Sequence, residues 1–144
     1  MSDSTSYTVD MRVWDVTKTE ALATSIGDML GVAYKESSGA DMSWYSSKAG
    51  DVGDVARAIR EIDPTAIFQV WEDPAYEYMG TLVISVPGHD LFHADCDSDG
   101  SVYLSYDALC AELDSGKTVA QAYGEDLLAL MPGKTHDAPT STTL

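Results

Sequence analysis

Three turn signals constrain the fold of this chain most strongly, because they divide residues 67–104 into four short segments. The turns read EDPA at 72–75, PG at 87–88 and SDG at 98–100. The segments are rich in β-branched and aromatic residues and run from Ile67 to Trp71, Tyr76 to Val86, Leu91 to Asp97 and Val102 to Leu104. Turns at this spacing are typical of neighbouring antiparallel strands. We therefore predict an antiparallel β-meander.

The residues before the meander predict strands and helices in alternation. Apolar and polar residues alternate from Tyr7 to Val13, as in a half-buried strand. A helix follows, with Thr17 and Glu20 at capping-box spacing. Its apolar face comprises Leu22, Ile26, Met29, Leu30 and Ala33. The segment from Met42 to Ser46 is expected to add a short strand.

A second helix is expected to open at Asp51 and to end at Pro64. Its buried stripe comprises Val52, Val55, Ile59 and Ile62. Two short helices are predicted after the meander. One covers residues 106–113, with Ser105 as its cap and Gly116 as its stop. The other covers residues 119–130 and begins with a capping box of Thr118 and Gln121.

The predicted order is β-α-(β)-α-β-β-β-β-α-α, which keeps most strands together. This order favours an α+β fold over a parallel α/β sheet. A chain of 144 residues is one domain by length. We predict a single acidic domain over residues 1–131 and a disordered tail over residues 132–144, where the sequence PGKTHDAPTSTTL has few apolar residues.

The net charge of −16 arises from 24 acids and 8 bases, and the imbalance is local. Residues 1–60 hold nine acids and six bases, whereas residues 61–130 hold fourteen acids and only Lys117. Residues 61–116 contain twelve carboxylates and no lysine or arginine, so they form no internal salt bridges. Repulsion among these charges opposes a typical total stability of about 5–15 kcal/mol. The excess acid therefore calls for an explanation.

Three explanations of this charge are compared. Adaptation to high salt would spread acid over the whole surface, but the first 60 residues are almost balanced. A generally acidic domain with no specific role is the second explanation. The third is that carboxylates of residues 61–116 share one face and imitate the phosphates of nucleic acid, which carry about one charge per 1.7 Å of duplex. Such a surface would occupy the basic groove of a nucleic-acid-binding protein or nuclease.

We adopt the third explanation as a hypothesis: a non-enzymatic inhibitor or modulator of a basic nucleic-acid-handling protein. In overall character, though by no motif, the chain is similar to the small acidic phage and plasmid proteins that inhibit host defence nucleases, such as anti-CRISPR and antirestriction proteins. The predicted contacts are Glu72, Asp73, Glu77, Asp90, Asp95, Asp97 and Asp99, with Trp71 and Tyr76 as aromatic anchors. An acidic adaptor that does not compete with nucleic acid is the alternative.

The segment DCDSDGSVYLSYDAL from Asp95 to Leu109 resembles an EF-hand calcium loop in two registers. A loop starting at Asp95 puts Tyr106 at the twelfth position, where a bidentate glutamate belongs. A loop starting at Asp97 puts Val102 in place of the glycine and Ala108 in place of the glutamate. We therefore favour a hairpin turn of the Asp-Gly type with exposed aspartates.

Histidines near this segment suggest a further alternative. His89, His93, Asp95 and Asp97 would lie on one face of a strand and could hold zinc or iron. Two histidines near a hairpin end are more often ordinary surface residues. A metal-binding domain using the segment from His89 to Asp99 stays an alternative, and the preferred interpretation has no metal and no cofactor.

Motifs of enzymes and of nucleic-acid-binding proteins are missing from the sequence. There is no GxSxG elbow, no GxxxxGK[ST] loop and no GxGxxG turn, so we expect no enzymatic activity. Direct nucleic-acid binding needs a surface rich in lysine and arginine, and residues 61–116 contain neither. The N-terminus lacks the apolar core of a secretory signal, and no apolar run of membrane-spanning length occurs. We expect a cytoplasmic protein with no membrane partner.

Overall fold

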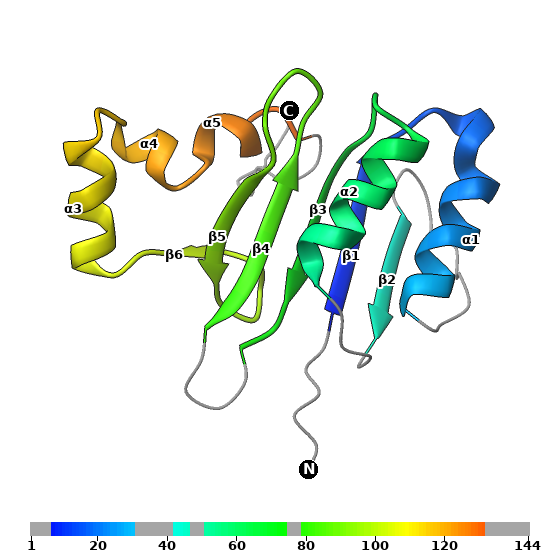
Figure 1. Cartoon of the computed structure of the whole chain (residues 1–144), viewed down its shortest axis with the longest axis horizontal. Helices are drawn as coiled ribbons and strands as arrows, with labels where there is room; N and C mark the ends of the chain where they lie inside the picture. The colour runs from blue at the N-terminus through cyan, green and yellow to red at the C-terminus, as the bar shows by residue number, and fades with distance from the viewer. Residues whose placement is uncertain (1–6, 31–41, 47–50, 75–78, 132–144) are drawn as a thin grey trace, which may run out of the picture.

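The computed structural model describes residues 7–30, 42–46, 51–74 and 79–131. These residues form a six-stranded antiparallel sheet with helices (Figure 1). The strands are β1 (Tyr7–Val13), β2 (Met42–Ser46), β3 (Ile67–Glu72), β4 (Gly80–Ser85), β5 (Phe92–Cys96) and β6 (Val102–Tyr103). The α-helices are α1 (Thr19–Leu30), α2 (Val52–Ile62), α3 (Tyr106–Asp114), α4 (Val119–Ala122) and α5 (Glu125–Leu128). The α+β class is confirmed.

The strand order is β2-β1-β3-β4-β5-β6, and every neighbouring pair is antiparallel. Strands β3 to β6 follow one another along the sheet, so the predicted meander is confirmed. The first strand, β1, lies between β2 and β3, because the helical connections carry the chain across the sheet. Residues 75–78 and the tail at 132–144 lie outside the described residues.

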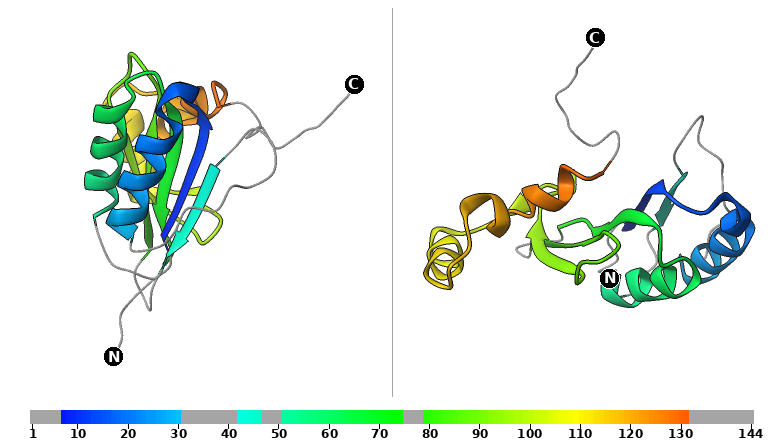
Figure 2. Two further views of the ribbon diagram at one scale, coloured as in Figure 1. Left: turned by 90° about the vertical axis from the view of Figure 1, so that its right-hand side faces the viewer. Right: turned by 90° about the horizontal axis from the view of Figure 1, so that it is seen from above.

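One face of the sheet packs against α1 and α2 (Figure 2). This main core joins apolar residues of β1, β3 and β4 with Leu22, Ile26, Val55 and Ile59 from the helices. Asp51 caps α2 by accepting a hydrogen bond from the Gly53 N–H at 2.7 Å, which confirms the predicted start of this helix. The predicted apolar stripe of α2 is buried except at Ile62, which is only half-buried.

The opposite face of the sheet carries a second, smaller core. It joins Trp71, Leu82, Ile84, Val86 and Cys96 with Leu127 of α5 and with Met131. The two cores arise from alternation along the strands, since neighbouring residues of a strand point to opposite faces. This second core holds the C-terminal helices against the meander.

Two details of the helices differ from the sequence-based expectation. The capping box at Thr17 is wrong: Asp15 caps a 3₁₀ turn, η1 (Val16–Lys18), and accepts the Thr17 N–H at 3.0 Å. The single helix predicted over residues 119–130 is two helices, α4 and α5. Gly124 separates them at φ 69°, and a Cβ there would lie 2.8 Å from the Phe92 ring. Both the left-handed backbone and the close approach to the aromatic ring favour glycine at this position.

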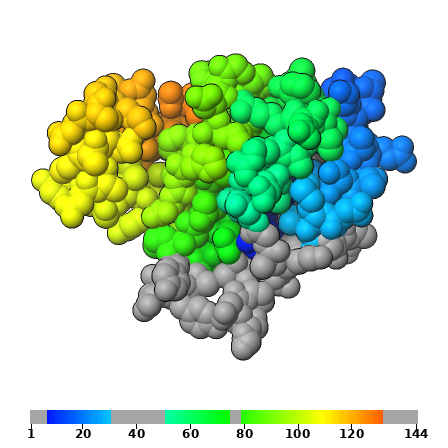
Figure 3. All heavy atoms as spheres, in the orientation of Figure 1, coloured from blue at the N-terminus to red at the C-terminus, as the bar shows by residue number. Residues whose placement is uncertain are grey.

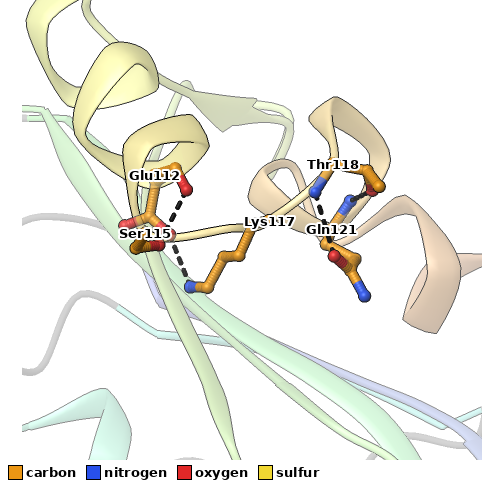
Figure 4. Close-up of polar contacts among 5 residues, drawn as sticks. All are labelled: Glu112, Ser115, Lys117, Thr118 and Gln121. Atoms are coloured by element: carbon orange, nitrogen blue, oxygen red, sulfur yellow. Dashed lines mark hydrogen bonds and ion pairs between the residues drawn. The ribbon is translucent and has the colours of Figure 1, made fainter.

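The third helix packs against little of the remaining protein. It has no buried residue, and Figure 3 shows α3 and α4 as a lobe at one side of the molecule. Ser105 caps α3, as predicted, and accepts the Ala108 N–H at 3.1 Å. Lys117 pairs with Glu112 at 2.5 Å, and the capping box of Thr118 and Gln121 starts α4 (Figure 4).

Candidate protein-interaction site

Five carboxylates gather where β3 and β5 end and the chain turns into β6. Four of them surround the buried thiol of Cys96, whose pKa is raised to about 12 by burial and then by the charges of nearby acids. These acids are Asp97, Asp73, Asp95 and Glu72. Asp99 joins the group because its charge raises the pKa of Asp73. We name Glu72, Asp73, Asp95, Asp97 and Asp99 the acidic end.

The register of the strands sets the direction of the Glu72 and Asp95 side chains. Glu72 pairs with Thr81, and Thr81 pairs with Asp95, so Glu72 and Asp95 lie on the sheet face that carries the main core. Asp99 lines a cavity with Gln69, which belongs to the opposite face. The acidic end therefore wraps around the end of the sheet, and the prediction of one common face is wrong.

Asp97 shapes the turn that carries two of these acids, Asp97 itself and Asp99. Its carboxylate accepts the Asp99 N–H at 2.9 Å and the Ser101 N–H at 3.0 Å, and its carbonyl accepts the Gly100 N–H. Gly100 has φ 78°, which suits glycine. The turn joins β5 to β6, as predicted, and Asp95, Asp97 and Asp99 are exposed. Asp97 thus has a structural role besides its charge.

Asp73 is half-buried, whereas Asp95, Asp97 and Asp99 are exposed. Its pKa is raised by burial first and by the charge of Asp99, while a hydrogen bond from the Trp71 side chain opposes both. An ionised Asp73 is therefore unfavourable in the folded protein relative to the unfolded chain. A nearby cation from a partner would relieve this cost.

The lysines and arginines that the structure describes bind elsewhere. Arg12 pairs with Asp10, Arg57 with Asp54, and Lys117 with Glu112. Arg60 donates to the carbonyls of Val86 and His89, and Lys18 to that of Ile62. Within the described ranges, no lysine or arginine forms an ion pair with Asp73, Asp95, Asp97 or Asp99. These four aspartates of the acidic end are thus available to an external cation.

Two of the predicted contacts do not fit a surface role at this end. Trp71 is only 8% exposed and lies in the second core, so its interpretation as a surface anchor is wrong. Asp90 is exposed, but it belongs to the turn before β5 and lies at the opposite end of that strand from Asp95. Tyr76 and Glu77 lie outside the described residues.

The histidine segment does not form the arrangement expected for a metal. His89 lies in the turn between β4 and β5, whereas His93 and Asp95 project from one face of β5. The expected alignment of His89 with them on one strand face is therefore wrong. Among the residues that the structure describes, no group of three His, Cys, Asp or Glu side chains is placed to hold a metal ion.

Other surface features were not predicted from the sequence. Tyr106 is 80% exposed, and Leu113 and Val119 are also exposed on the lobe of α3 and α4. The sequence signal is the short length of α3, since nine residues between two breaks leave little room to bury a face.

None of the described helices has the length and apolar composition that a membrane span requires. Comparison with known protein families, curated proteins and solved structures finds no match for this chain.

Proposed function

We propose that this protein is a non-enzymatic acidic inhibitor or modulator that binds the basic groove of a nucleic-acid-handling protein. The acidic end is the contact surface, and the observation that carries the proposal is that Asp73, Asp95, Asp97 and Asp99 form no ion pair with a described lysine or arginine. Five carboxylates carry the charge of roughly 8 Å of duplex, at one charge per 1.7 Å. The acids of the lobe add to the field that steers a basic partner toward this end.

The free cysteines support a reducing compartment for this function. Cys96 is buried and Cys110 half-buried, and neither forms a disulfide. Free thiols are the usual state in the cytoplasm, where nucleic-acid-handling enzymes act. The proposal therefore places the protein in the cytoplasm, in the manner of the phage and plasmid anti-defence proteins.

Competition with nucleic acid tests this proposal. The protein is used to capture its partner from the native cell at low salt, and a labelled 20-base-pair duplex is then titrated into the complex. A mimic and the duplex exclude each other, so the partner is released as the duplex binds. A ternary complex would reject mimicry.

An acidic adaptor that leaves nucleic acid bound is the second candidate. The exposed apolar residues of the lobe, Tyr106, Leu113 and Val119, favour it, because such side chains act as anchors in protein interfaces. A ternary complex in the competition experiment would support this candidate. Loss of binding on replacing Tyr106 with serine would place the contact on the lobe.

A further inference from the structure

A cavity of about 260 Å³ lies beside the turn between β5 and β6, on the sheet face opposite α1 and α2. Its walls come from β3, from the turn and from the C-terminal helices. The lining residues are Gln69, Asp99, Gly100, Ser101, Val102, Tyr123, Glu125 and Leu128. Segments distant in sequence therefore build one site, which no local motif could reveal.

The lining combines exposed acids with half-buried apolar surface. Asp99 and Glu125 are exposed and supply two carboxylates from different elements. Tyr123 and Leu128 are half-buried and supply a ring and an aliphatic side chain. Lysine and arginine do not occur among the lining residues. The site therefore offers hydrogen-bond acceptors and an apolar wall, but no cationic donor.

Gln69 gives the independent indication of a ligand. Its side chain is buried, with 1% exposure for the residue, and lines the cavity. Its Nε2 donates to the Gly100 carbonyl at 3.2 Å, which fixes the orientation of the amide. Its Oε1 accepts no hydrogen bond within the described part of the chain. A buried acceptor of this kind requires a donor from water or from a ligand.

We propose that this cavity binds the side chain of an arginine presented by the basic partner, an inference that rests on the proposed function. A guanidinium has five donors and no acceptor, which complements the carboxylates of Asp99 and Glu125 and the Gln69 amide oxygen. Its plane stacks on an aromatic ring, here that of Tyr123, and its methylene groups pack on Leu128. Lysine lacks the planar group and fits the site less well.

A peptide titration of the free chain tests the site without the partner. Acetyl-Gly-Arg-Gly-amide is added to ¹⁵N-labelled protein, and the amide signals of Gln69, Ser101 and Tyr123 are followed by NMR. We predict saturable shifts confined to the cavity and at least tenfold weaker binding of the lysine peptide. The citrulline peptide, which has nearly the same shape but no charge, should give no saturable shift.

Matched variants identify the acceptors. Asp99→Asn with Glu125→Gln removes both exposed charges and should weaken binding of the arginine peptide at least tenfold. The control is Asp90→Asn with Asp126→Asn, which removes two charges from a separate cavity beside His89 and Lys117 and should leave binding unchanged. All four positions are exposed, so the folded spectrum should persist in both variants.

Equal shifts with the citrulline peptide, or full binding by the Asp99→Asn, Glu125→Gln variant, would overturn the arginine site. Because this assay contains no partner, its failure leaves the acidic end untouched as a contact surface. Conversely, binding of the arginine peptide would stand even if the competition experiment rejected nucleic-acid mimicry. The two proposals thus fail separately.

Discussion

Gly100 rests directly on the Trp71 ring, so that a Cβ at position 100 would lie 2.8 Å from the ring atom Cδ2. The Gly100 carbonyl also accepts the Gln69 side-chain N–H. The turn that carries Asp97 and Asp99 is therefore fixed to β3 by one close packing contact and one buried hydrogen bond. A rigid turn holds its carboxylates in place, which lowers the entropy cost of binding a partner.

Replacing Gly100 with alanine should destabilise the protein strongly. An L-residue at φ 78° costs about 1–2 kcal/mol, and overpacking against the ring adds about 1–3 kcal/mol. Gly88→Ala is the matched control, because Gly88 has φ 83° but no atom within 4 Å of a Cβ. Urea unfolding should show the larger loss for Gly100→Ala. Equal losses would show that the ring contact contributes nothing.

Asp97 should matter for stability more than its exposed neighbours do. Asp97→Ala removes the acceptor of two backbone N–H groups and should cost about 1–2 kcal/mol of unfolding free energy. Asp97→Asn keeps an acceptor oxygen and should retain most of this stability. Asp95→Ala is the control, since the Asp95 side chain is exposed and lies outside the turn. A loss for Asp95→Ala as large as that for Asp97→Ala would refute the structural role.

Cys96 should be unreactive and should make stability depend on alkaline pH. Its pKa is about 12 in the folded protein against 9.0 in the unfolded chain, so the folded state keeps the proton longer. The contribution of the protonated thiol to the free energy of unfolding is complete below about pH 9. It is lost as the pH rises toward 12, by about 4 kcal/mol at most. Urea unfolding between pH 8 and 11 should therefore show a flatter pH dependence for Cys96→Ala than for the wild type. Parallel curves would contradict the raised pKa.

Replacing Asp73 with asparagine should raise the melting temperature at pH 7 and low salt. The raised pKa of Asp73 means that its ionised form is disfavoured in the folded state, and asparagine removes this charge while keeping an acceptor for the Trp71 side chain. Salt screens the repulsion from Asp99, so the gain should shrink in 1 M NaCl. A lower melting temperature under both conditions would show that the Asp73 carboxylate stabilises the fold.

The sequence was sufficient for the fold because its local signals agree. Turns with glycine or proline delimit β3 to β6, and Asp51, Ser105 and Thr118 cap helices where predicted. The predictions failed where tertiary contacts override a local pattern. Gly124 divides the last helix at a left-handed φ of 69° and lies close to Phe92, a residue 32 positions earlier in the chain.

The candidate site was predicted only in part. Charge counting found the acidic end, because an acid-rich segment without bases has no local ion-pair partner. The sequence-based prediction also placed Trp71 on the surface, because a strand pattern does not tell which face a later turn will cover. It missed the cavity with Gln69 and Glu125, because these residues are 56 positions apart and meet only in the folded protein.

Charge reversal at the acidic end tests whether this surface binds the partner. The double variant Asp95→Lys, Asp99→Lys leaves the Asp97 turn intact, and Glu20→Lys, Asp28→Lys on α1 makes the same change in net charge at exposed positions elsewhere. Binding of the captured partner is measured by surface plasmon resonance at 0.15 M salt. We predict that the first variant binds at least tenfold more weakly and the second binds within about twofold of the wild type. Equal affinity of the two variants would contradict the account.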